Sequence, residues 1–144
     1  MTGEAMTALE KMKNWLTSFP LWSEKQLPVD NTDGIPEHCG LFCRGVEEIS
    51  RRQDVLGNTE ILSRLRFTLC RTAANSADNT DNANWLLALQ AWIRQQSALG
   101  LTPVFGDLPH SERIRAENGK LQDASQAGTA RYTADITVEY TNLY

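Results

Sequence analysis

The sequence lacks any apolar run long enough to cross a membrane. A membrane-spanning helix needs about 18 or more consecutive apolar residues, and no stretch of these 144 residues approaches that length. The N-terminus also has no basic region followed by an apolar stretch and a small-residue cleavage site. We therefore expect a soluble protein that carries no signal peptide and no membrane span.

Cysteine is scarce, with only Cys39, Cys43 and Cys70. An odd number of cysteines cannot all pair within one chain and is typical of a reducing compartment. His38 lies beside Cys39, but a structural zinc site takes four ligands, commonly as two close pairs. Only Cys70 and His110 remain to complete such a site, and neither belongs to a second pair. The sequence predicts unbridged thiols and no metal site.

Motifs for catalysis and cofactor binding are also missing. The sequence contains no glycine-rich phosphate loop, no Gly-x-Ser-x-Gly and no dinucleotide fingerprint. His38 could activate Cys39 only if their side chains met, and neighbours in an extended segment point to opposite faces. Asp107 and His110 could form an acid–base pair, but an aspartate shortly before Pro109 is typical of a turn. We predict no catalytic residue, no cofactor and no enzymatic activity.

Neither positive nor negative charge is in large excess. The chain has 14 basic and 18 acidic residues, for a net charge of −4. The basic residues are scattered along the sequence, which gives little support to a nucleic-acid groove. Arg51 and Arg52, with Arg44 nearby, form the densest cluster, but acidic residues such as Glu48 interleave with them. We interpret this cluster as a solvated strand face rather than a polyanion site.

The overall composition is that of an ordinary globular domain, with 41% hydrophobic and 22% charged residues. A chain of this length fits one domain, spanning 1–144, and buries roughly 70% of its unfolded surface. Residues 72–82 are the exception, because they contain only alanine, serine, asparagine, aspartate and threonine and no large apolar side chain whose burial could stabilise an ordered structure. We predict a flexible loop there.

The N-terminal part, residues 1–36, is predicted to be a helix and a connector. Apolar residues recur at helical spacing over Ala5–Phe19, with Thr2 as a candidate cap, and Pro20 ends the pattern. Leu21–Pro36 contains two prolines and turn-forming residues, which indicates an extended connector.

A β-hairpin is predicted next. Leu41–Val55 alternates imperfectly, which favours a strand at a sheet edge, and Glu60–Arg71 places apolar and polar residues on opposite faces. Gly57-Asn58 has the composition of a two-residue turn between them.

A second helix is predicted over Asn84–Leu99, with Asp81 or Asn82 as its cap and Gly100 as its stop. Its broad apolar face contains two tryptophans, which predicts packing on a sheet. The residues of this face are Trp85, Leu86, Leu89, Trp92, Ile93 and Leu99.

Two strands complete the pattern. Arg113–Gln122 reads as a strand in which Asn118-Gly119 is either a tight turn or a bulge. Ala130–Tyr144 alternates strictly, with one apolar face made of Tyr132, Ala134, Ile136, Val138 and Tyr140. The predicted fold is α+β with two layers, in which helices pack on one face of a mostly antiparallel sheet of four to five strands.

An ordered series of short segments carries a family resemblance across most of 40–144. Two segments lie in the predicted hairpin, Gly40-Leu41-Phe42 and Asp54-Val55-Leu56-Gly57-Asn58. The others are Asn84-Trp85-Leu86, Gln90-Ala91-Trp92-Ile93, Gln96-Ser97, Pro103-Val104-Phe105-Gly106-Asp107, Ala116-Glu117-Asn118-Gly119 and Tyr132 to Tyr140. In these segments the chain resembles the tail-terminator or "minor capsid" proteins of tailed bacteriophages and of prophages of Gram-positive bacteria.

The resemblance implies a structural virion protein located in the tail and assembled in the bacterial host cytoplasm. Such proteins form a homo-oligomeric ring, usually of six copies, that caps the tail tube and stops its growth. The implied partners are the tail tube protein and a head completion or connector protein. A closed ring needs head-to-tail contacts between unlike surfaces, and sheet edges and loops are plausible means of making them.

We expect assembly contacts on the charged hairpin and on the adjoining loop. The residues concerned are Arg44, Glu48, Arg51, Arg52, Asn75, Asp78 and Asn79. The same residues could instead be plain solvated surface. Two other functions stay open at this point: a different head–tail connector, or a cytosolic small-ligand-binding module whose pocket Trp85 and Trp92 line.

Overall fold

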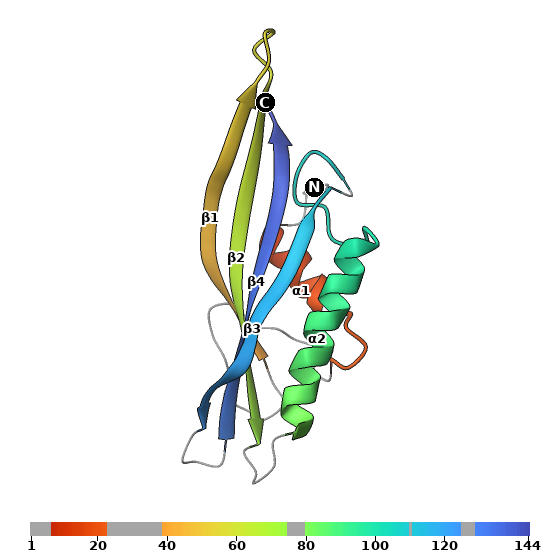
Figure 1. The fold of residues 1–144 in the computed structure, drawn as a ribbon, viewed down its shortest axis with the longest axis vertical. Coiled ribbons are helices and arrows are strands. Elements are labelled where there is room, and N and C mark those ends of the chain that lie inside the picture. Colours follow the sequence, from red (N-terminus) through yellow and green to blue (C-terminus); the bar gives the residue numbers. More distant parts are fainter. Residues whose placement is uncertain (1–6, 23–38, 75–79, 110, 125–128) are drawn as a thin grey trace, which may run out of the picture.

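The computed structural model describes residues 7–22, 39–74, 80–109, 111–124 and 129–144. Four antiparallel strands form one sheet in the order β1-β2-β4-β3. Both helices lie on one side of it (Figure 1), which confirms the predicted α+β fold. The elements are α1 (Ala8–Leu16), β1 (Cys39–Gln53), β2 (Thr59–Ala74), α2 (Thr80–Ala98), β3 (Arg113–Ala124) and β4 (Thr129–Leu143).

Most of the buried residues that the sheet contributes to the core lie on its two central strands, β2 and β4. Phe67 lies opposite Ile136 and Leu65 opposite Val138, and all four side chains are buried. Because residues directly opposite each other share a face, the alternation predicted for 130–144 places its apolar side chains under the helices. β1 is an edge strand, as its imperfect alternation predicted.

α1 begins later than the sequence pattern suggested. Thr7 is its N-cap in a capping box, where the Glu10 backbone N–H donates to Thr7 Oγ1 at 3.2 Å. The expected start at Ala5, with Thr2 as cap, is therefore wrong. Thr7 offers the reciprocal threonine–glutamate pair that defines a capping box. Residues 1–6 and the connector 23–38 lie outside the described part of the chain.

The loop predicted over 72–82 is wrong at both ends. Residues 72–74 continue β2, and Ala73 is buried opposite Ala130 of β4. At the other end α2 begins at Thr80, so Asp81 lies in its first turn and is not the cap. Small side chains let two backbones pair closely. The amino-acid composition of residues 72–82 does not show that part of the segment forms such backbone hydrogen bonds. Residues 75–79 lie outside the described residues.

The end of α2 agrees with the prediction. Gly100 has a positive φ of 71°, which glycine adopts without steric cost. Its backbone N–H donates to the Ser97 carbonyl, and the Leu101 N–H donates to the Gln96 carbonyl at 2.9 Å. These two bonds make a Schellman motif that satisfies the last carbonyls of the helix. Leu99, expected on the apolar face, lies past the helix end and is 60% exposed.

The tryptophans of α2 contact both the α1 region and the sheet. Trp92 lies 5.0 Å from Trp15 between ring centroids, and Phe19 meets Trp85 edge-on at 5.6 Å. Trp85 also packs against the β2 and β4 residues Ala73, Ala130, Tyr132 and Ala134, as the sequence predicted, and Leu86, Leu89 and Ile93 supply the buried contacts of the same helix. An aromatic layer therefore joins the two helices, and α2 reaches the strands through Trp85 and its aliphatic side chains.

Candidate interaction surface

The helices cover one face of the sheet and leave the other face open. We call the uncovered side the open face. Its residues follow from the register of the strand pairs, because two residues directly opposite each other on neighbouring strands point to the same face of the sheet. Its basic residues are Arg44, Arg52, Arg64, Arg66, Arg113, Arg115, Lys120 and Arg131. Its acidic residues within the described side chains are Glu47, Glu60, Glu117, Asp135 and Glu139.

The open face is basic although the chain is acidic. Among its described side chains eight are basic and five are acidic, an excess of three basic residues, whereas the whole sequence carries a net charge of −4. The basic residues are scattered along the sequence, but the fold brings eight of them onto one face. Residues that alternate along four neighbouring strands gather on one side of a sheet even when they are far apart in sequence.

Bulges in both edge strands direct side chains onto this face. In β1 the register shifts between Cys43 and Gly45, so that Arg44 is the extra residue, and Gly45 has a φ of 97°. In β3 the register shifts between Glu117 and Lys120, and Asn118 has a φ of 57°. Asn118-Gly119 is thus a bulge, which settles the alternative that the sequence left open.

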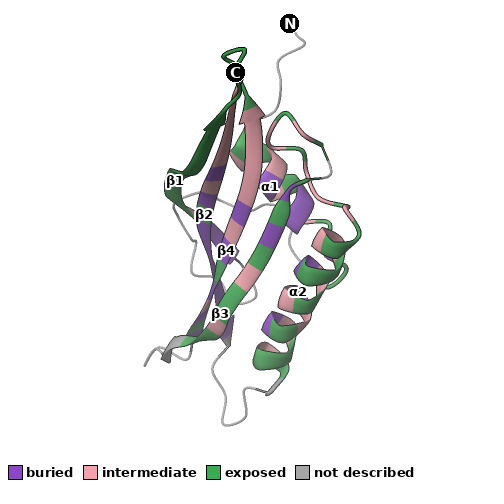
Figure 2. Ribbon diagram, turned by 45° about the horizontal axis from the view of Figure 1, so that its top comes forward, coloured by how far each residue is buried: buried purple, intermediate pink, exposed green. Residues whose placement is uncertain are grey.

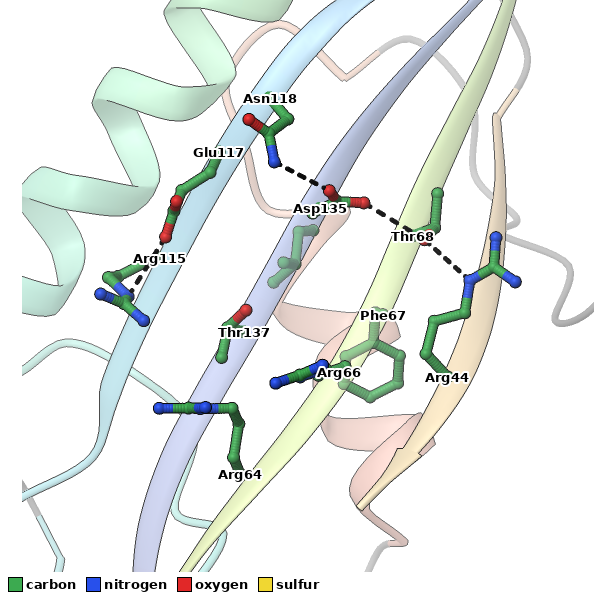
Figure 3. A pocket seen from close by; sticks show the side chains of 11 residues that line it. Arg44, Arg64, Arg66, Phe67, Thr68, Arg115, Glu117, Asn118, Asp135 and Thr137 are labelled. Atoms are coloured by element: carbon green, nitrogen blue, oxygen red, sulfur yellow. Dashed lines mark hydrogen bonds and ion pairs between the residues drawn. The ribbon is translucent and has the colours of Figure 1, made fainter. Parts of the chain in front are cut away.

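A chain of polar contacts runs across all four strands at the level of these bulges (Figure 3). Arg44 Nε donates to Thr68 Oγ1 at 3.0 Å, and Thr68 Oγ1 lies 3.5 Å from Asp135 Oδ1. From the other edge, Asn118 Nδ2 donates to Asp135 Oδ2 at 3.1 Å. The two edge residues are therefore held in place by the two central strands.

A shallow groove of about 500 Å³ lies beside this chain of contacts, and four arginines line it. Arg64 is the best compensated, since its guanidinium contacts Glu139 at 3.2 Å and Glu47 at 3.4 Å. Arg66 contacts Glu47 at 2.7 Å, but its side chain is 52% exposed. Arg115 is 56% exposed beside Glu117. Arg66 and Arg115 can therefore still reach charged groups brought in from outside.

The turn of the β1–β2 hairpin projects beyond the end of the sheet (Figure 1), while β4 pairs along β2 as far as Glu60 opposite Leu143; we call this exposed end of the hairpin the arm. Every side chain of β1 from Cys43 onward is exposed, as Figure 2 shows in green. The turn at its tip holds Val55, fully exposed, and Leu56, which is 83% exposed. Two apolar side chains at the end of a projecting hairpin are a surface that another protein could cover.

The turn itself differs from the prediction of a two-residue Gly57-Asn58 loop. It spans Asp54–Asn58, with Gly57 at a φ of 87°. The Asp54 carboxylate accepts from the backbone N–H groups of Leu56 and Asn58 and from Asn58 Nδ2. These bonds, the side-chain bond from Asn58 above all, lower the pKa of Asp54. An aspartate that caps its own turn favours the longer loop with a glycine at the left-handed position.

The expected assembly contacts divide between the two surfaces. Arg44 and Arg52 lie on the open face. Arg51 lies opposite Ile61, on the side that the helices cover farther along the sheet, and pairs with Glu48 at 2.9 Å. The other expected contacts, Asn75, Asp78 and Asn79, lie outside the described residues.

Two acidic residues hold the connection before β3: Asp107, which the sequence assigned to a turn, and Glu112, which the sequence did not single out. Asp107 Oδ2 accepts from the Leu143 backbone N–H at 2.8 Å. Glu112 is buried, and its Oε2 accepts from the N–H groups of Phe105 and Gly106. Asp107 therefore organises this loop against β4, and His110, with which the sequence left an acid–base pair open, lies outside the described residues.

Cys39 and Cys70 lie on neighbouring strands but on opposite faces of the sheet, and no disulfide bond joins the three cysteines. Cys39 and Cys70 are buried and Cys43 is exposed. Burial raises the pKa of the Cys70 thiol. Within the described ranges, no three His, Cys, Asp or Glu side chains gather closely enough to hold a metal ion; His38 is outside those ranges.

Comparisons with protein-family models and with curated proteins found no match to this chain. In the part of the chain that the structure describes, no helix is both long and apolar enough to cross a membrane.

Proposed function

We propose that this protein is a structural component of a phage or prophage virion, a tail terminator that forms a ring on the end of the tail tube. The observation that carries the proposal is the hairpin arm with its exposed apolar tip, Val55 and Leu56. A ring closes only when one surface of each copy meets a different surface of the next. The arm and the open face are two such unlike surfaces on one chain.

The other functions considered from the sequence are less well supported. A pocket lined by Trp85 and Trp92 would need free indole faces, but these rings pack against Phe19, Trp15 and Trp22. A different head–tail connector would use the same surfaces toward a head-side partner, so the identity of the bound partner separates the two assembly functions.

The test uses a purified tail tube protein from the phage or prophage genome that encodes this chain. Tubes polymerised with the full-length protein should be shorter and carry a density at one end in electron micrographs. V55S/L56S should lose this capping because its tip is polar. L87S/L101S is the matched control, since Leu87 and Leu101 are also exposed leucines but lie away from the arm.

The charged cluster of the arm is tested in the same assay. R51E/R52E should impair capping, because glutamate at position 51 would repel Glu48, its present partner at 2.9 Å, and both substitutions reverse a surface charge. Normal capping by R51E/R52E would remove these two arginines from the contact. Bare tube ends with the wild-type protein, together with binding to a head-side protein, would replace the terminator function with that of a connector.

A further inference from the structure

We propose that the open face contains a binding site for a phosphate group, in a hollow between Arg44, Lys120 and Arg131. The hollow has a volume of about 370 Å³. It lies beside the groove of four arginines, on the other side of the chain of polar contacts that crosses the sheet. We call it the basic hollow. The tip of the arm supplies no residue to it, so this site and the proposed tube capping succeed or fail in separate experiments.

The register of the strands explains why this part of the open face is hollow. Cys70 of β2, Thr133 of β4 and Lys120 of β3 lie in one row across the sheet, and the β1 residue in that row is Gly40. The central strands therefore contribute short side chains to the row, and glycine adds none at the β1 edge. Cys70 is only 4% exposed, although it points to the face that the helices leave open. The row is thus the floor of the basic hollow.

Three basic side chains surround this floor, each from a different strand. Arg44 belongs to β1, Lys120 to β3 and Arg131 to β4. Among the described residues, the ion pairs of the sheet involve other arginines, and none of these three pairs with a carboxylate. Burial raises the pKa of the Cys70 thiol, and the positive charge of Arg131 acts against that rise. Arg131 therefore lies close enough to the floor for its charge to act there.

Arg44 is pre-organised to bind an oxyanion. Its Nε donates to Thr68 Oγ1 at 3.0 Å, and its two terminal nitrogens point away from Thr68 (Figure 3). The terminal nitrogens of a guanidinium can donate together to two oxygens of one phosphate. Lys120 and Arg131 are exposed and bring further donors from other strands. Donors from three sides suit the several oxygens of a phosphate better than the two oxygens of a carboxylate.

One carboxylate, that of Asp135, also lies at the basic hollow. Asn118 Nδ2 donates to its Oδ2 at 3.1 Å, and Thr68 Oγ1 lies 3.5 Å from its Oδ1. Three basic groups and this one acidic group leave an excess of two positive charges. A phosphate monoester carries nearly two negative charges at neutral pH, whereas each phosphate of a nucleic-acid backbone carries one. The basic hollow therefore suits a phosphate dianion, either free or at the end of a small molecule.

The test follows the amide signals of the full chain by two-dimensional NMR while inorganic phosphate is added at constant ionic strength, with chloride as the balancing ion. We expect saturable shifts at Lys120 and Thr133. K120Q/R131Q should weaken binding about tenfold or more, because it removes two charged donors. R66Q/R115Q is the matched control, since it removes two charges from the same face outside the basic hollow, and it should change the affinity far less.

Fold integrity is checked by thermal unfolding of each variant without phosphate. Arg44→Lys is a second and milder variant, because it keeps the charge but loses the paired terminal nitrogens, and it should weaken binding several-fold. Wild-type protein that shows no saturation at tens of millimolar phosphate overturns the proposal. Equal weakening by K120Q/R131Q and R66Q/R115Q also overturns it, because the face would then attract anions only through its general charge.

Two further ligands identify the source of the phosphate group. Glycerol phosphate that binds more tightly than inorganic phosphate, and that K120Q/R131Q weakens, indicates a phosphorylated small molecule. Tighter binding of inorganic phosphate indicates the free ion. A DNA duplex that binds more tightly than both, and that R66Q/R115Q weakens as much as K120Q/R131Q does, replaces the phosphate site with a nucleic-acid surface.

Discussion

The guanidinium group of Arg71 lies over the indole ring of Trp85, with 4.0 Å between its Cζ atom and the ring centroid. Arg71 belongs to β2 and points to the helix side, where it is only 5% exposed. Trp85 belongs to α2 and also donates from Nε1 to the Leu21 carbonyl at 3.0 Å. One indole ring therefore connects the sheet, the second helix and the segment after α1.

We predict that Trp85→Leu destabilises the fold by about 2–3 kcal/mol, because it removes the ring under Arg71 as well as the hydrogen bond to Leu21. Trp85→Phe keeps an aromatic face for the guanidinium and should cost about 1 kcal/mol less. Urea unfolding measures both. If both variants lose the same free energy of unfolding, the contact between the Arg71 guanidinium and the aromatic ring contributes nothing to stability.

Two glycines make a matched pair for a packing test. A Cβ at Gly106 would collide with the backbone carbonyl of Thr141, which is fixed in β4, whereas a Cβ at Gly119 would first meet the side-chain amide of Gln90. We expect Gly106→Ala to lower the free energy of unfolding by about 2–3 kcal/mol and Gly119→Ala by about 1 kcal/mol. The difference arises because the Gln90 side chain can move aside, whereas the Thr141 backbone cannot. Chemical denaturation that ranks the two in the opposite order contradicts this account.

The elements with a strong local period could be predicted from the sequence. Strict alternation over 130–144 marks a half-buried strand, and β4 has that pattern, with Ile136 and Val138 fully buried. Gly100 marked the end of α2 because the backbone there needs a left-handed φ, which glycine adopts without steric cost. In both cases the signal lies within the segment itself.

The open face could not be predicted in this way. Arg44, Arg66 and Arg115 are up to 71 positions apart by residue number, and they meet only because the strand order and the register of four strands place them on one side. The bulge that sets the direction of Arg44 adds one residue to a strand, which breaks the period on which the sequence prediction relied. Arg71 shows the same limit, since an arginine in an alternating strand gives no sign of an aromatic partner on a helix.

The loop before β3 is predicted to depend on Asp107. Asp107→Ala should lower stability by about 1 kcal/mol, because the Leu143 N–H loses its acceptor. Asp107→Asn keeps a side-chain oxygen and should cost about half as much or less. Hydrogen exchange of the Leu143 amide gives the local readout, since it should speed up in the alanine variant. Unchanged exchange there would show that Asp107 does not anchor this loop.

The turn at the tip of the arm is predicted to loosen in acid. The hydrogen bonds from Asn58, together with those from the backbone of Leu56 and Gly57, lower the pKa of Asp54 in the folded state. A carboxyl group with a lowered pKa stabilises the fold above its ordinary range, and this contribution is lost as the pH falls through the folded value, below about pH 4. The amide signals of Gly57 and Asn58, followed by NMR during an acid titration, should therefore shift in that range. Asp54→Asn has no carboxyl group to protonate, so its turn signals should stay constant over the same titration. If they shift as in the wild type, another group controls the turn. Because Val55 and Leu56 are held by this turn, the tip that we propose to contact the neighbouring protein should lose its shape in the same pH range.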